Sequence, residues 1–182
     1  LRFEGVGSVA DLYVNGVHLG QHRGAFGAFC FELTDKLKYG ATNEIMLRAD
    51  NSWRSDVPPL SGDFPMFGGI YRPVALLVKD AACITPLDYA SPGVFLTQKA
   101  VSKEQATVTV LTKLDNAGTN AGLEVQCVIK DAAGKVLASD TQAVRVEKEA
   151  TVTQEFTLAK PHLWHGRKDP YLHTVEVTLK KN

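Results

Sequence analysis

The feature that most constrains this chain is an alternation of apolar and other residues with a period of two. Residues 10–14 follow it, and an Asn15-Gly16 pair comes next, before apolar side chains resume at Val17. An Asn-Gly pair between alternating segments is the strongest short-range signal for a β-hairpin. The period recurs at residues 29–33 and 45–49, and no long segment has helical periodicity. The sequence therefore predicts an all-β protein.

The second half of the chain shows short strand patterns at regular spacing. The expected strands cover residues 94–98, 106–114, 122–130, 135–146, 151–158 and 172–179. Asp-Asn-Ala-Gly at 115–118 and Asp-Ala-Ala-Gly at 131–134 have turn composition. Six or seven short strands in about 100 residues fit an immunoglobulin-like β-sandwich, here without the Cys…Trp…Cys pattern of antibody domains. We place the domain boundary near residues 81–85.

Composition and charge exclude several classes of partner. The 182 residues, 45% of them hydrophobic, suffice for one large or two small domains. Twenty basic and twenty acidic residues cancel, and no run of like charge occurs. We therefore expect no nucleic-acid partner and no membrane partner. No signal peptide is visible and the chain starts at Leu1 without a Met, so we expect a piece of a longer protein.

The cysteines and histidines do not suggest a metal site or a cofactor. The three cysteines are far apart and form no CxxC pair, which argues against a disulfide framework and a structural zinc site. Cys30 and Cys127 instead fit small buried apolar positions. His18 and His22 stand four apart, but they follow a hairpin turn rather than lying on a helix. We expect no metal and no cofactor.

A loop-to-strand corner follows a long Pro-containing loop that ends near residue 67, and it leads into an apolar run at residues 74–78 that we expect to be a strand. Gly68 and Gly69 allow backbone angles that a side chain would forbid, so the chain can turn sharply there. Arg72 carries five donors and is suited to holding a loop carboxylate or backbone carbonyls. We expect structural roles for these three residues. Loops this long on a β scaffold are often functional.

Five motifs, met in order along the chain, resemble a known family. They are Tyr-Val-Asn-Gly-Val-His-Leu-Gly at 13–20, Gly-Ala-Phe at 24–26 with Phe-Cys-Phe-Glu-Leu-Thr at 29–34, Gly-Ala-Thr-Asn at 40–43, Gly-Gly-Ile-Tyr-Arg-Pro-Val at 68–74, and Pro-His-Leu-Trp at 161–164 with Pro-Tyr-Leu at 170–172. The chain resembles the non-catalytic N-terminal part of glycoside hydrolase family 2 enzymes, which are β-galactosidases, β-glucuronidases and β-mannosidases. The resemblance covers essentially the whole chain.

The resemblance implies a fold and a role. It implies a truncated, partial jelly-roll (galactose-binding-like) β-sandwich over residues 1–81 and an immunoglobulin-like β-sandwich over residues 82–182. A TIM barrel with two catalytic glutamates would come next in a β-galactosidase-like parent. This chain would brace that barrel and shape the rim of the substrate pocket, so we expect no catalytic residue in it. Retaining glycosidases need two carboxylates about 5 Å apart, and the family supplies both from the barrel.

The expected partners follow from the same resemblance. They are the parent's own catalytic domain and, only together with that domain, a carbohydrate. Self-association through the truncated first domain is a further expectation, because strands that lack their neighbours leave open edges. Two other roles stay open: a free-standing carbohydrate-binding or adhesion module, and a purely structural linker.

Three residues are candidates for substrate binding. Asp63 stands where family galactosidases place an acidic residue that reaches the active-site mouth, and a loop-capping role is the alternative for it. Trp53 and Arg54 form the second candidate, since an exposed indole beside polar groups can stack on a sugar. A tryptophan in a β-sandwich is more often part of the core, and we expect Trp164 to be a structural core residue.

Overall fold

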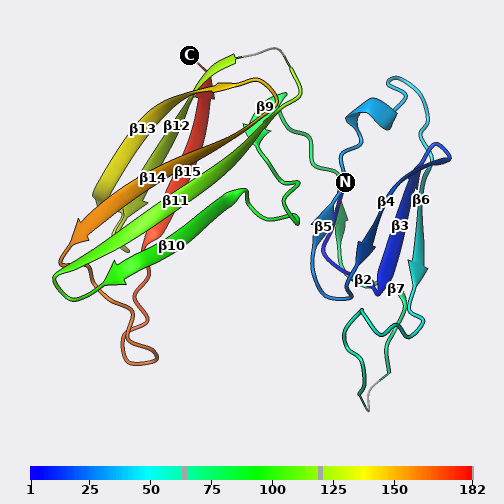
Figure 1. Ribbon diagram of the computed structural model, residues 1–182, viewed down its shortest axis with the longest axis horizontal. Helices are drawn as coiled ribbons and strands as arrows, with labels where there is room; N and C mark the ends of the chain where they lie inside the picture. The colour runs from blue at the N-terminus through cyan, green and yellow to red at the C-terminus, as the bar shows by residue number, and fades with distance from the viewer. Residues whose placement is uncertain (63–64, 119–120, 182) are drawn as a thin grey trace. The chain divides into compact units, whose positions relative to one another are not determined.

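The computed structural model describes residues 1–62, 65–118 and 121–181, and its regular secondary structure consists almost entirely of antiparallel strands (Figure 1). This confirms the all-β fold class. Within those ranges the one helical element is the short 3-10 turn η1 (Thr34–Lys36). The chain divides into a first unit, Leu1–Val78 with Pro86–Ser91, and a second unit, Lys79–Thr85 with Pro92–Asn182.

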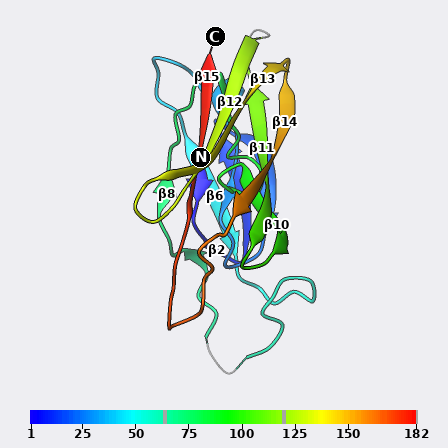
Figure 2. The ribbon, with the colours of Figure 1, turned by 90° about the vertical axis from the view of Figure 1, so that its left-hand side faces the viewer.

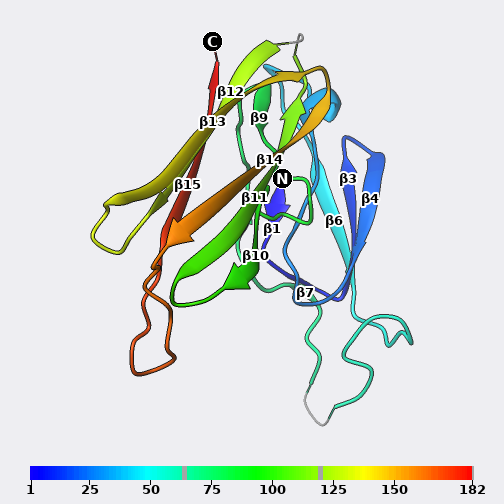
Figure 3. The same cartoon turned by 60° about the vertical axis from the view of Figure 1, so that its left-hand side comes forward.

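The first unit contains three small antiparallel sheets. Their strand orders are β4-β3-β6, β5-β1-β8 and β2-β7, and Figure 3 shows the first of them, with β6 beside β3. The strands are β1 (Arg2–Phe3), β2 (Val6–Gly7), β3 (Val9–Val14), β4 (Val17–Arg23), β5 (Phe29–Cys30), β6 (Ile45–Asp50), β7 (Gly69–Ile70) and β8 (Val74–Ala75).

The predicted hairpin is present between β3 and β4. Asn15 and Gly16 form its turn with φ values of 51° and 81°, the left-handed region that this pair tolerates best. The Asn15 side chain also ties the turn to distant segments. Its amide nitrogen donates to the Lys36 carbonyl at 2.8 Å, and its oxygen accepts the Glu44 amide N–H at 3.1 Å. Asn15 therefore fixes both the hairpin and the approach to β6.

The core of the first unit lies between these sheets. Phe29 stacks on Phe3 with ring centroids 4.9 Å apart, and His22 stacks on Phe29 at 4.1 Å. Burial lowers the pKa of His22. The buried members of this core are Phe3, Val6, Ala10, Leu12, Val14, Phe29 and Leu33.

Two expected strands of the first unit are shorter than their apolar patterns. The pattern at residues 29–33 forms a ladder only over Phe29–Cys30, and Cys30 is half-buried rather than buried. The apolar run at 74–78 pairs only over Val74–Ala75, and Val78 is 88% exposed. An apolar run is buried only where another layer covers it, and no described part of the first unit covers this one.

The second unit is a two-layer antiparallel sandwich, as expected of an immunoglobulin-like domain. One sheet has the order β10-β11-β14 with β9 also paired to β11, and the other has the order β13-β12-β15. Figure 2 shows the long strands β11 and β14 running side by side. The strands are β9 (Ala82–Ile84), β10 (Val94–Val101), β11 (Gln105–Asn116), β12 (Ala121–Lys130), β13 (Val136–Val146), β14 (Glu149–Ala159) and β15 (Thr174–Lys181).

Side chains from facing strands of the two layers form the core of this unit. Val110 from β11 and Phe156 from β14 pack with Cys127 and Ile129 from β12. Alternate residues of β14 are buried, which is the period-two pattern of a strand with one face inward. Cys127 is fully buried, as expected, and burial with the nearby Asp140 carboxylate raises the pKa of its thiol to about 11. The expectation for Trp164 is wrong, since it is 65% exposed.

Candidate functional site

The candidate site is built on the residue that ends β6. The Asp50 carboxylate accepts the Ser52 amide N–H at 2.9 Å and a guanidinium N–H of Arg54 at 2.8 Å. Its backbone carbonyl accepts the Ser8 amide N–H at 3.1 Å, which joins the corner to the strands beside it. The hydrogen bonds from Ser52, followed by that from Arg54, hold the pKa of the Asp50 carboxyl well below its usual range. The carboxylate therefore stays charged and organises the turn that follows.

Trp53 lies on this turn with its ring in solvent. The side chain is 72% exposed, so the core position that is commoner for tryptophan in a β-sandwich does not apply. Its indole N–H donates to the Leu60 carbonyl at 2.9 Å, which fixes the ring from its polar edge. A fixed, exposed indole face is a surface on which the C–H face of a sugar or another flat ligand can stack.

The loop after Trp53 is tied back at several points. The Asn51 side-chain amide donates to the Met66 carbonyl at 2.9 Å, and the Arg23 guanidinium pairs with the Asp56 carboxylate at 2.5 Å. Val57, a residue of this loop, is buried. A Cβ on Gly68 would lie 2.9 Å from the Asn51 side chain, so this position needs glycine for close approach. The described parts of this loop are thus held by specific bonds.

The corner that follows the loop is held from beneath by an aromatic residue and a cation. The Tyr71 hydroxyl donates to the Ala25 carbonyl at 2.5 Å. Arg72 donates to the Phe26 carbonyl at 3.2 Å and lies over the Tyr71 ring, with its guanidinium carbon 5.2 Å from the ring centroid. Gly69 has a φ of +91°, a conformation that residues with a side chain rarely adopt.

Exposed apolar side chains surround this corner. Phe67 is 77% exposed and Phe26 is 55% exposed, and Ile70 is also exposed. Arg72 and Tyr71 hold the backbone on which Phe26 sits, while Phe67 and Ile70 flank the glycine turn. Exposed apolar side chains that gather on one part of a surface can mark an interaction site.

The structure treats the three predicted substrate-binding residues differently. Trp53 is exposed and available, whereas Arg54 already donates to Asp50. Asp63 lies outside the described residues. The sequence analysis did not identify Asp50 as a residue of the candidate site. The Asp-Asn-Ser sequence after an alternating strand could have shown it, because an aspartate that accepts the N–H two residues on is a common turn signal.

Other kinds of site have no support among the residues that the structure describes. No group of three or more His, Cys, Asp and Glu side chains there could hold a metal ion, and no helix there is long and apolar enough to cross a membrane. Three grooves are described in the second unit. One is lined by no carboxylate, and the other two by one each, Asp80 and Asp131. None of these grooves holds a carboxylate pair.

Comparison with known proteins then decides the family. A family model for glycosyl hydrolases family 2 matches residues 92–182, half of the chain. The chain belongs to glycosyl hydrolases family 2. The resemblance of its motifs to this family is thereby confirmed.

Individual members of glycosyl hydrolases family 2 match along the whole chain. A β-glucuronidase of Bacteroides fragilis is 44% identical over 100% of this chain and 26% of its own length. A β-galactosidase of Thermoanaerobacter pseudethanolicus is 31% identical over 98% of this chain and 23% of its own. A crystal structure from Bacteroides fragilis, 45% identical, superposes with a TM-score of 0.94 over 100% of this chain and 28% of that one. The chain thus spans about a quarter of the length of the curated relatives it matches.

Proposed function

We propose that this chain is a non-catalytic accessory region of a glycoside hydrolase, which braces the catalytic barrel and shapes the rim of its substrate pocket. The substrate would be a β-glycoside of the kind named for the relatives, a glucuronide or a galactoside. Membership of the family and the alignment with about a quarter of each relative support this role.

The proposal that the chain does no chemistry rests on the chemistry of glycoside hydrolysis. Both stereochemical routes need a pair of carboxyl groups across the scissile bond, one of them with a raised pKa. The shifted carboxyl groups of the described residues all move the other way. Hydrogen bonds lower the pKa values of Glu32, Asp50, Asp140 and Glu155. These groups are suited to holding loops and strands rather than to donating a proton.

The observation that carries the rim role is the exposed face of Trp53. Its ring is fixed through the indole N–H, and the Asp50–Arg54 pair holds the backbone on either side of it. A pre-positioned aromatic face binds with little loss of side-chain freedom. The exposed Phe26, Phe67 and Ile70 would supply apolar contact to the barrel.

Kinetics of the enzyme that carries this region test the role of Trp53. Because stacking on a sugar acts equally on the ground state and the transition state, Trp53→Ala should raise KM about two- to ten-fold and leave kcat nearly unchanged. Tyr39→Ala is the matched control, since Tyr39 is equally exposed on the first unit but lies outside the loop. An unchanged KM in Trp53→Ala would show that Trp53 does not contact the substrate at the rim.

Asp63 belongs to the same proposal on sequence grounds alone. It would accept hydrogen bonds from sugar hydroxyls, each contributing about 1.5–3 kcal/mol. In the same assay Asp63→Asn should weaken substrate binding by roughly ten-fold with little change in melting temperature. If Asp63 instead caps its own loop, the substitution should lower the melting temperature, and KM should change only as far as the loop loosens.

A further inference from the structure

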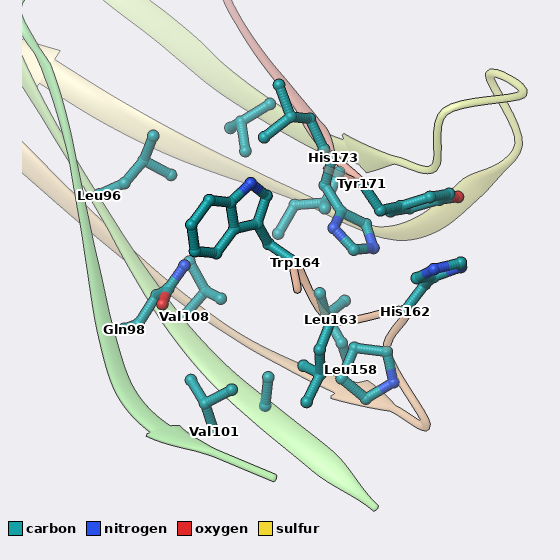
Figure 4. Close-up of a pocket in the computed structure, with 15 residues that line it drawn as sticks. Leu96, Gln98, Val101, Val108, Leu158, His162, Leu163, Trp164, Tyr171 and His173 are labelled. Atoms are coloured by element: carbon teal, nitrogen blue, oxygen red, sulfur yellow. The ribbon is translucent and has the colours of Figure 1, made fainter. Parts of the chain in front are cut away.

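One end of the second unit is hollowed by a groove of about 440 Å³ that the rim role does not use. Its floor is formed by core side chains of the sandwich, among them Val108, Ile129 and Leu158. Trp164 and Leu172 stand at its opening and are 65% and 71% exposed. In the view of Figure 4 the indole of Trp164 lies between the side chains of Gln98 and His173. The Trp164 ring thus forms a wall over an apolar floor.

The loop that carries Trp164 is held in place by a frame of polar and aromatic contacts. The His162 ring and the Asp169 carboxylate are bonded at 2.6 Å, and His165 and Asp169 exchange backbone hydrogen bonds. The His162 ring stacks on Tyr171 with centroids 3.8 Å apart and an interplanar angle of 4°. The Tyr171 hydroxyl accepts the Ala132 amide N–H at 3.1 Å. The loop that carries the Trp164 ring is therefore held in place without a ligand.

The lining of the groove defines the chemistry of its occupant. It contains no Lys, Arg, Asp or Glu, so a charged ligand would lose hydration and meet no permanently charged side chain in the lining. Five lining side chains carry polar atoms. Those of His162 and Tyr171 are bonded to Asp169 and to the Ala132 amide, and the other three are the Gln98 amide, the His173 imidazole and the Trp164 indole N–H. Within the described chain, Gln98 and Trp164 form no side-chain hydrogen bond, so they have donors and acceptors to offer a ligand.

We propose that this groove binds a neutral, flat aromatic ring that carries hydroxyl or ether groups on one edge, such as the aglycone end of an aryl glycoside. The ring packs on the apolar floor against Trp164, and its polar edge faces Gln98 and His173. A volume of about 440 Å³ lies within the roughly 300–1,000 Å³ of small-molecule sites, which are mostly apolar with a few placed polar groups. This proposal does not rest on the role proposed for the first unit.

Isoleucine methyl NMR of the intact chain tests the proposal directly. The chain has four isoleucines, Ile45, Ile70, Ile84 and Ile129. Of these, Ile129 lines the groove. Titration with phenyl β-D-galactoside should shift the Ile129 methyl signal and leave the other three in place. Methyl β-D-galactoside has the same sugar without the ring, and we expect it to bind at least ten-fold more weakly.

Two variants locate the binding and report on the fold. Trp164→Ala should weaken phenyl galactoside binding about ten-fold or more, while unchanged Ile45, Ile70 and Ile84 signals show that the chain is folded. Tyr39→Ala removes an exposed aromatic side chain that lies outside this groove and outside the Trp53 loop, and it should bind as the parent chain does. Three results would overturn the proposal: equal binding of the two galactosides, an unmoved Ile129 signal, or full binding by Trp164→Ala. A shift of the Ile129 signal with protein concentration in the absence of ligand would also overturn the proposal, because it would mean that a second copy of the chain occupies the groove.

Discussion

Asp50 contributes more to the geometry of the candidate site than its neighbours Trp53 and Arg54 do. One carboxylate accepts the Ser52 amide N–H and the Arg54 guanidinium, and these bonds set the backbone on which Trp53 stands. Sequence reasoning found Trp53 and Arg54 but assigned both to substrate. Which partner satisfies Arg54 depends on the turn geometry, and residue types alone do not reveal it.

Replacing Asp50 by Asn should destabilise the first unit in a pH-dependent way. The folded pKa of this carboxyl lies below its unfolded value of about 4, so its contribution is present above that value and is lost as the pH falls. The difference in free energy of unfolding between Asp50→Asn and the parent chain should be clear at pH 7 and shrink below about pH 4. Urea unfolding followed by circular dichroism measures it. The control is Asp35→Asn, which replaces an exposed carboxylate in η1 and should change the free energy of unfolding little at either pH. If the destabilisation by Asp50→Asn is the same at both pH values, the carboxylate charge is not its cause.

Among the elements, the long strands were predictable and the short ladders were not. The pattern at 151–158 became β14 (Glu149–Ala159), because each side chain there faces either the core or solvent and the alternation records which. The run at 74–78 is apolar without alternation, which indicates burial but not what covers it. The core position expected for Trp164 was wrong for the same reason, since its exposure depends on neighbours far along the chain. The strand at 172–179 begins later than expected, at Thr174.

The exposed run after β8 should make the isolated chain self-associate. Leu76 and Val78 are 61% and 88% exposed, and contact between copies would remove this apolar surface from water. Sedimentation velocity should show an average mass that rises with concentration, and Val78→Lys should reduce the rise. Val136→Lys places the same charge on an exposed valine of the second unit and should leave it unchanged. A concentration-independent monomer would contradict this expectation.

At the scale of the whole molecule, we propose that the chain binds and supports rather than reacts. Two β units of glycosyl hydrolases family 2 present an exposed tryptophan on the first and an apolar groove on the second. The family and the β-sandwich class could be predicted from motifs and alternation. The groove could not, because its floor comes from strands β10, β11, β12, β14 and β15, which only the folded sandwich brings together.

We propose that this chain lacks catalytic chemistry of its own, and a hydrolysis assay tests that proposal. The purified chain should release no nitrophenol from 4-nitrophenyl β-D-glucuronide or 4-nitrophenyl β-D-galactoside above a protein-free blank. A full-length family member, assayed beside it at the same concentration, supplies the positive control. Turnover by the chain that survives a second purification, in proportion to the protein present, would show that the chain is itself catalytic.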